Sequence, residues 1–312
     1  MGVVRKDPRY DEYYSLKAIP SKPVSIPSYA YHDRFEKQWR GRMMVDIEAI
    51  SKIFVGTGEY ELGSRGIYQP FARTNKGLVM PGTSIKGVVR TYAEALSPSC
   101  EGGSRPREGE RCNPDQGRLC IACCIFGALG FQGRVTFCDT GALDPSAISP
   151  DEYAMSVRRS DREGRYDDGR RFYYHNKPSS PQLVNERTGR PFPDERVEVV
   201  PKGTFTTELL FENLSTEEMG LLLLAMGLSP DYRFDLKLGG GKNRRLGSVR
   251  FHLPSGIQVV TEDAYISFAP SYETKQMDDW GKGAVMSYLD SLTERQRRLA
   301  RECIKAFQID PS

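Results

Sequence analysis

Four cysteines lie close together in a polar part of the chain, between residues 100 and 123. The last pair is separated by two residues, which is the chelating spacing of a zinc knuckle. Few apolar residues precede that pair, so the segment would struggle to become ordered without a metal ion. We predict a structural zinc segment here, with Cys124 as an alternative ligand; inert thiols on a flexible loop are the other interpretation. The predicted ligands are Cys100, Cys112, Cys120 and Cys123.

Two glycine-rich loops carry clustered basic residues. The first, Pro81–Arg90, leads into an expected helix, whose free N–H groups and positive dipole end suit a phosphate. The second, Leu238–Gly247, holds three successive glycines, which let the backbone approach a ligand closely. The predicted phosphate contacts are Gly82, Thr83, Ser84, Lys86, Arg90, Gly240, Gly241, Lys242, Asn243, Arg244 and Arg245.

Each loop also has a plainer interpretation. The first could be an ordinary helix start, capped by Thr83 or Ser84, with two solvated cations. The second could be a flexible tip between two strands. The first loop lacks the Gly-x4-Gly-Lys-Ser/Thr spacing of a nucleotide-binding P-loop. A polyanion such as RNA suits both loops, and we expect no small-molecule substrate.

Residues 150–202 are rich in Arg and Lys and show little apolar periodicity, so we expect a long insertion that extends from the core. Within it, cations alternate with aromatic rings, a pattern that can pair with phosphates and stack on unpaired bases. The other interpretation is a solvated hairpin whose aromatic rings pack on the core, and the two are compatible. The predicted RNA contacts of the insertion are Arg158, Arg159, Arg170, Arg171, Tyr173 and His175.

The composition is that of a globular protein rather than of a membrane protein. The 312 residues include 44 Lys or Arg and 41 Asp or Glu, a net charge of only +3. The charge balance alone therefore does not indicate a nucleic-acid ligand, and the clustering of the cations in loops carries that prediction. No apolar run approaches the ~20 residues that span a bilayer, and the N-terminus lacks the apolar core of a secretion signal. We predict a cytoplasmic location, no membrane partner and reduced cysteines.

The regular segments predict an α+β fold. The expected elements are strand 42–55, helix 85–96, strand 134–138, strand 203–211, a helix from a Ser215–Glu218 capping box to about 227, strand 234–238, strand 247–252 and helix 281–308. This order is typical of a ferredoxin-like or RNA-recognition-motif core, here with a long insertion and a zinc-knuckle insertion. We expect an N-terminal docking arm over 1–40, a core domain over 41–260 and a C-terminal helical extension over 261–312.

Several of these segments together resemble the RAMP (repeat-associated mysterious protein) superfamily. Pro81–Arg90 resembles its signature helix start, Cys120–Gly127 followed by Gly133–Phe137 and Asp139 resembles its next motif, and Gly239–Val249 resembles its glycine-rich loop. Gly169–His175 looks like a thumb segment of this group. The similarity is greatest to backbone subunits of type III CRISPR effector complexes, particularly the zinc-containing subtypes D and E.

This resemblance implies a modified RNA-recognition-motif fold that binds the backbone of a guide RNA. It also implies stacking with other subunits of the superfamily, and an insertion that acts as a thumb on the duplex of guide and complementary target RNA. Both functions would serve antiviral defence.

The resemblance also bears on catalysis. Members that cut target RNA carry an Asp two residues before a Pro, where this chain has Tyr68. A phenol cannot replace a carboxylate that binds a divalent metal at neutral pH, so we predict no cleavage by this subunit. Alternatives are a shifted acid, Glu59 or Glu61, a guide-processing endonuclease using His175, and a protein–protein adaptor that does not bind RNA.

Overall fold

The computed structural model describes most of the chain. The described residues are 13–20, 23–32, 38–63, 66–100, 112–143, 151–156, 169–176, 194–261 and 271–308. In these ranges, no helix is long and apolar enough to cross a membrane.

The core is an antiparallel sheet with a ferredoxin-like strand order. Its four core strands lie side by side in the order β15-β3-β13-β9. The first of these four along the chain, β3, therefore pairs with the fourth and the third, and the second, β9, lies at the edge. Each half of the core is a strand–helix–strand unit, which confirms the predicted α+β fold. The six elements are β3 (Trp39–Ala49), α1 (Gly82–Leu96), β9 (Val135–Phe137), β13 (Thr204–Leu214), α3 (Thr216–Ala225) and β15 (Ser248–His252).

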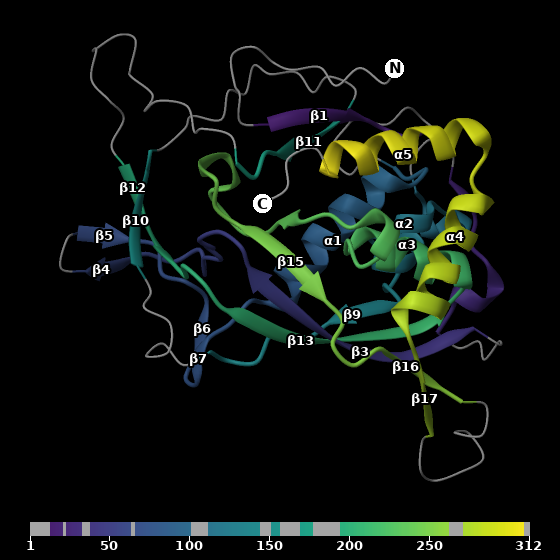
Figure 1. Cartoon of the computed structure of the whole chain (residues 1–312), viewed down its shortest axis with the longest axis horizontal. Coiled ribbons are helices and arrows are strands. Elements are labelled where there is room, and N and C mark those ends of the chain that lie inside the picture. Colours follow the sequence, from purple (N-terminus) through teal and green to yellow (C-terminus); the bar gives the residue numbers. More distant parts are fainter. Residues whose placement is uncertain are drawn as a thin grey trace.

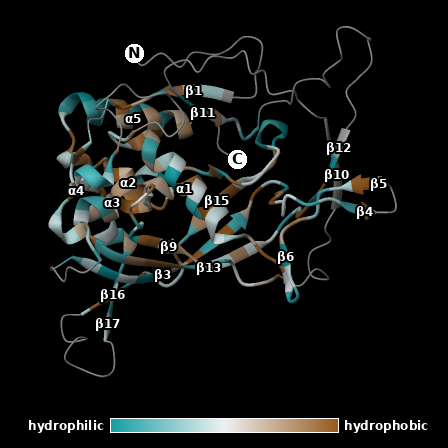
Figure 2. Cartoon of the chain, turned by 180° about the vertical axis from the view of Figure 1, so that it is seen from behind, coloured by the Kyte–Doolittle hydropathy of each residue, from teal (hydrophilic) through white to brown (hydrophobic). Residues whose placement is uncertain are grey.

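One face of the sheet is covered and the other is open. Buried and accessible residues alternate along β3 and β13, as expected when successive side chains point to opposite faces. The helices lie together on one side of the sheet (Figure 1). Hydrophobic stretches of β3 and β9 lie along this layered core (Figure 2).

Additional elements extend this core. The short strands are β1 (Tyr13–Lys17), β2 (Val24–Ser25), β4 (Glu61–Gly63), β5 (Gly66–Tyr68), β6 (Arg73–Thr74), β7 (Gly77–Leu78), β8 (Arg118–Leu119), β10 (Asp151–Ser156), β11 (Gly169–Tyr173), β12 (Asp194–Val199), β14 (Leu236–Lys237), β16 (Ile257–Val260) and β17 (Tyr272–Lys275). The other helices are α2 (Ile121–Phe126), α4 (Lys282–Ser291) and α5 (Glu294–Gln308), with a π-helical turn at Met277–Gly281 before α4.

The expected insertion divides into two parts. Strands β10 and β12 pair with each other and lie near β4 and β5 at one end of the molecule (Figure 1). Strand β11 instead returns to the helical side and pairs with β1, which belongs to the expected N-terminal arm. The described part of that arm thus docks on its own chain.

Aromatic rings join these distant segments into one core. Tyr92 of α1 contacts the rings of Phe172 in β11, Phe234 and Phe307 in α5, at centroid distances of 5.1, 5.6 and 4.8 Å. Tyr14 of β1 stacks on Phe172. The arm, the insertion and the C-terminal helices therefore share a hydrophobic core with the central domain.

Three local expectations were wrong. Thr83 and Ser84 do not cap α1, since the helix begins at Gly82 after Pro81 and has no side-chain cap at its N-cap residue. The alternative of a flexible loop is wrong for residues 121–124, which form the start of α2. The expected helix 281–308 is two helices, α4 and α5, separated at Leu292 and Thr293. The capping box of Ser215 and Glu218 is confirmed at the start of α3.

Candidate functional site

The four predicted metal ligands meet in space. The sulfur atoms of Cys100, Cys112, Cys120 and Cys123 all lie within 4.8 Å of one another. Cys100 Sγ lies 3.5 Å from Cys123 Sγ and 3.6 Å from Cys120 Sγ. With Zn–S bonds near 2.3 Å, tetrahedral sulfurs would lie about 3.8 Å apart. The donor set is therefore compatible with a structural zinc ion. Within the described ranges, no other group of three or more such ligands comes together.

Neighbouring groups suit thiolates at this site. The backbone N–H of Cys120 points at Cys112 Sγ (3.1 Å), and that of Cys123 points at Cys120 Sγ (3.4 Å). The guanidinium of Arg90 lies 3.4 Å from Cys123 Sγ. Hydrogen bonds and a nearby cation favour the charged form of a thiol, which is the form that binds metal.

Cys124 is not part of this cluster. Its sulfur accepts a hydrogen bond from Arg134 (3.3 Å), whose guanidinium forms a buried ion pair with Glu218. Burial raises the pKa of the Cys124 thiol to about 11. The alternative ligand set that includes Cys124 is therefore wrong, and Cys124 instead belongs to a buried polar contact that joins α2 and α3 through Arg134, the residue before β9.

The first glycine-rich loop packs tightly against the sheet. The N–H of Gly82 donates to the Asp139 carboxylate (2.8 Å), which occupies a donor at the N-terminus of α1. A Cβ at Gly82 would lie 1.9 Å from the carbonyl oxygen of Phe137, so the helix start can approach β9 only with glycine there. Thr83 is exposed and Ser84 is partly exposed in the first turn.

The two cations of α1 are partly buried and bonded within the chain. The ammonium of Lys86 donates to the carbonyl of Val135 (2.8 Å), and burial followed by the charge of Arg90 lowers its pKa. Arg90 donates to the carbonyl of Gly127 (2.9 Å) and to the carboxylate of Glu94 (2.8 Å). Both side chains therefore hold α1 to its neighbours.

The second glycine-rich loop closes against the segment that follows β3. The N–H of Gly240 donates to the carbonyl of Phe54 (2.8 Å). Gly239 has φ +85°, and a Cβ there would lie 2.1 Å from the same carbonyl oxygen. Gly241 and Arg245 frame a short 3-10 turn, and both adopt the left-handed conformation. The loop thus presents an ordered turn rather than a free tip.

The cations of this turn differ in their surroundings. Arg244 is buried and Arg245 is exposed. Lys242 is partly buried, and burial lowers its pKa. No hydrogen-bond or ion-pair partner for its ammonium occurs in the part of the chain that the structure describes. A desolvated cation in this state gains stability from an anion, and the phosphate of a nucleic acid is one.

The described insertion residues differ in their surroundings. Arg170 forms an ion pair with Glu94 (2.6 Å) and donates to the carbonyl of Cys100 (3.1 Å). His175 is buried and its ring nitrogen lies 2.9 Å from Ser248 Oγ. Arg171 is exposed, and Tyr173 is partly exposed. The expected contacts Arg158 and Arg159 lie outside the described residues.

The loop in which catalytic relatives carry an Asp forms a small hairpin, β4–β5. Tyr68 lies opposite Glu61 in the register, and its hydroxyl donates to that carboxylate (2.8 Å). This hydrogen bond raises the pKa of Tyr68. Leu62 and Ile67 face each other across the hairpin and are 83% and 64% exposed, which leaves an apolar tip. Glu59 is exposed just before the hairpin.

The sequence interpretation missed the role of Glu94. This carboxylate is only 6% exposed and bridges Arg90 and Arg170, the two arginines that also contact the cysteine cluster. Its position four residues after Arg90 was the available signal, since side chains at this spacing meet on a helix. The pairing with Arg170 had no such signal, because it joins residues distant in sequence.

The comparisons with known proteins agree with this geometry. No curated protein matches the sequence of the chain. A family model described as the RAMP superfamily matches residues 46–250, well over half of the chain. This range begins within β3, ends within β15, and includes the cysteine cluster and both glycine-rich loops. RAMP proteins are generally CRISPR-associated and bind RNA. The chain belongs to the RAMP superfamily.

Proposed function

We propose that the chain is an RNA-binding subunit of a type III CRISPR ribonucleoprotein in the cytoplasm. It holds the backbone of the guide RNA, supports binding of complementary target RNA and stacks with other subunits of its superfamily. The observation that carries this proposal is the ordered glycine turn, where Lys242 is desolvated without a partner in the described structure. Family membership supports the choice of RNA as the anion.

The proposed guide contact centres on the second loop. Gly240, Gly241, Asn243 and Arg245 surround Lys242, and the exposed first turn of α1 adds Thr83 and Ser84. Such contacts bind phosphates and sugars rather than base edges, so base pairing with the guide would supply the sequence specificity. Lys86, Arg90 and Arg170 act mainly by holding this surface in place, because their charged groups already have partners.

We also propose that the four-cysteine cluster holds a structural Zn²⁺, as in the zinc-containing subtypes D and E. A bound Zn²⁺ would join the polar segment after α1 to the start of α2. The surrounding N–H groups and Arg90 favour the thiolates it needs. This metal centre supports the RNA surface and takes no part in a reaction.

We propose no cleavage of target RNA by this chain. Tyr68 stands where catalytic relatives carry an Asp, and its hydroxyl is bonded to Glu61. Metal-dependent cleavage of guide-matched RNA by the assembled complex, abolished by Glu61→Ala, would contradict this. The division into an arm at 1–40, an RNA-binding domain at 41–260 and a helical extension at 261–312 stays part of the proposal.

Salt-dependent binding of a labelled single-stranded guide RNA tests the proposed contact. Each lost contact between a cation and a phosphate reduces the magnitude of the slope of log affinity against log salt by about 0.7 for a single strand. We expect Lys242→Ala to produce this loss, and Lys76→Ala, which removes an exposed cation from the β6–β7 turn, to leave the slope unchanged. An unchanged slope for Lys242→Ala would remove the loop from the binding surface.

A further inference from the structure

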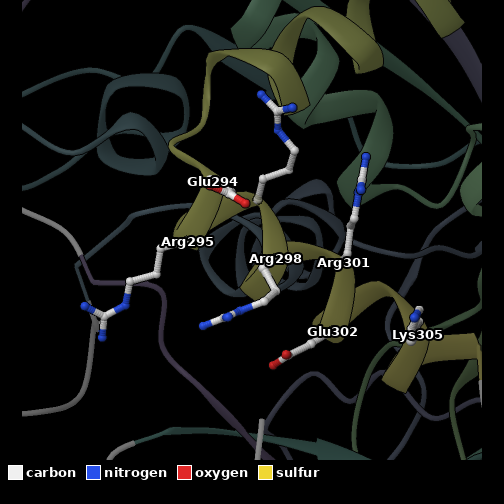
Figure 3. A pocket seen from close by; sticks show the side chains of 7 residues that line it. Glu294, Arg295, Arg298, Arg301, Glu302 and Lys305 are labelled. Atoms are coloured by element: carbon white, nitrogen blue, oxygen red, sulfur yellow. The ribbon is translucent and has the colours of Figure 1, made fainter. Parts of the chain in front are cut away.

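Helix α5 carries a row of exposed cations that the proposed guide contact does not use. Four basic residues from successive turns line one open depression, and they define what we call the α5 stripe: Arg295, Arg298, Arg301 and Lys305. With a rise of 1.5 Å per residue, the stripe is about 15 Å long. Figure 3 shows these side chains extending from the helix.

The stripe is fixed in place by the opposite face of the helix. Ala300, Cys303, Ile304 and Phe307 are buried, and α5 packs against α1. Thr293 immediately precedes the helix, and its hydroxyl accepts from the N–H of Gln296 (3.4 Å). The cations therefore project from a rigid, amphipathic element rather than from a mobile loop.

The stripe carries four cations, and the only carboxylates that line the same depression are Glu294 and Glu302. No ion pair or hydrogen bond to its four side chains occurs among the described residues. The neighbouring Arg297, by contrast, bonds the carboxylate of Asp290 (3.3 Å) and the carbonyl of that residue. Helix α5 contains five cations and two carboxylates, so its net charge of +3 equals that of the whole chain. The other residues of the chain therefore sum to no net charge.

The open face of the sheet carries acidic side chains, and three of them already have partners. Glu208 pairs with Arg42, Glu48 contacts His252 and Glu212 contacts His32. Such satisfied carboxylates gain little from a second copy of α5. A partner with regularly spaced, unpaired negative charges fits the stripe better, and a phosphate backbone has this property.

We propose that the α5 stripe binds the phosphate backbone of RNA at a second place, separate from the glycine loop at Lys242. The contact is independent of base sequence, because a helix surface lined by cations reads charge and not base edges. Arginine suits it since the guanidinium fork binds phosphate oxygens in pairs. The inference stands on the charges of α5 and does not require the guide contact to be correct.

The test compares two triple variants of the full chain that lose the same charge. The stripe variant carries Arg295→Gln, Arg298→Gln and Arg301→Gln, and the control carries Lys76→Gln, Lys202→Gln and Lys282→Gln at dispersed exposed positions. Binding of a labelled 30-nucleotide oligouridylate is measured by fluorescence anisotropy over a range of salt concentrations. We expect the stripe variant to lower the salt slope by roughly two units, from three lost contacts of about 0.7 each, and the control to leave it unchanged.

Other outcomes overturn the proposal. Equal slopes for the two triple variants would mean that only net charge matters. An unchanged RNA slope together with loss of self-association would make the stripe a protein contact.

Adding Lys242→Ala to the stripe variant separates the two RNA sites, because independent contacts lower the slope additively. The single Arg298→Gln, with about a third of the effect, replaces the triple variant if its thermal unfolding shows a folding defect.

Discussion

The ammonium of Lys242 lies partly buried in a turn made largely of glycine backbone. Burial lowers its pKa from the ordinary value of 10.5, because the charged form loses solvation that no partner in the described structure replaces. A bound phosphate would favour the charged form and reverse this shift. RNA binding and protonation of Lys242 are therefore linked.

This linkage predicts a pH dependence that an ordinary lysine would not give. As pH rises through the lowered pKa, Lys242 loses its proton and RNA affinity should fall, before exposed lysines titrate. The folding stability of the RNA-free chain changes in the opposite direction. The buried charge of Lys242 lowers that stability below the lowered pKa, and this cost is lost as pH rises from that pKa towards 10.5. Lys242→Arg keeps its charge, so the fall should move to higher pH. Anisotropy with 2′-O-methyl RNA, which resists alkaline hydrolysis, measures both curves, and coincident curves would contradict the linkage.

Gly82 and Gly87 form a matched pair within α1. A Cβ at Gly82 would lie 1.9 Å from the Phe137 carbonyl oxygen, whereas a Cβ at Gly87 would meet nothing within 4 Å. Gly82→Ala should lower the free energy of unfolding by about 1–3 kcal/mol through overpacking. Gly87→Ala should raise it by about 0.5–1 kcal/mol, because alanine favours the helix. Urea unfolding of the two variants measures this contrast, and a stabilised Gly82→Ala would show that the helix start is free to move.

At the scale of single residues, the sequence shows which residue types lie in a loop but not which contacts each of them makes. Glycine, lysine and arginine at 82, 86 and 90 fit a phosphate loop by type and spacing. The structure assigns Gly82 to close packing on β9, and gives Lys86 and Arg90 carbonyl partners on other elements. These tasks depend on residues brought close only by folding, so no local pattern could reveal them.

Among the elements, the cysteine segment is connected to three others. It contacts α1 through Arg90, β11 through Arg170, and it leads directly into α2. Loss of a metal ion from the cysteines would therefore loosen several elements at once, including the strand that anchors the N-terminal arm.

Metal content and stability should change together in a cysteine variant. We expect Cys120→Ser to lose bound zinc and, through a few kcal/mol, to lower Tm by roughly 5–10 °C. Cys138→Ser, outside the cluster, should keep both properties. Elemental analysis and thermal unfolding of each purified chain provide the measurements. Less than a small fraction of one zinc per wild-type chain would dismiss the metal site.

The elements also show which local signals were sufficient. The capping box at Ser215 and Glu218 places the start of α3 correctly. A second such signal, Thr293 with Gln296, marks the start of α5, and these side chains do exchange hydrogen bonds with each other's N–H groups. The prediction of a single helix over 281–308 did not take the Thr293–Gln296 signal into account. The break was therefore visible in the sequence, unlike the pairing of β1 with β11.

For the whole molecule, the ferredoxin-like core follows from the order of its strands and helices, because few sheet topologies satisfy that order. The attachment of the arm does not follow. Strands β1 and β2 are short, and their partners β11 and β8 lie in polar, irregular segments. The pairing of β1 with β11 is decided by burial of Tyr14, Leu16 and Phe172 in the completed core.

The strand order has a consequence for synthesis on the ribosome. The neighbours of β3 in the sheet are β13, β15 and β16, and the nearest of these follows it by about 150 residues. At a translation rate of ~5–20 residues per second, roughly 10–30 s pass between the synthesis of β3 and that of β13, its first partner in the sheet. During that interval its apolar face and both edges are open to other chains. The nascent protein should therefore depend on a chaperone or on neighbouring nascent subunits until Leu214 has emerged.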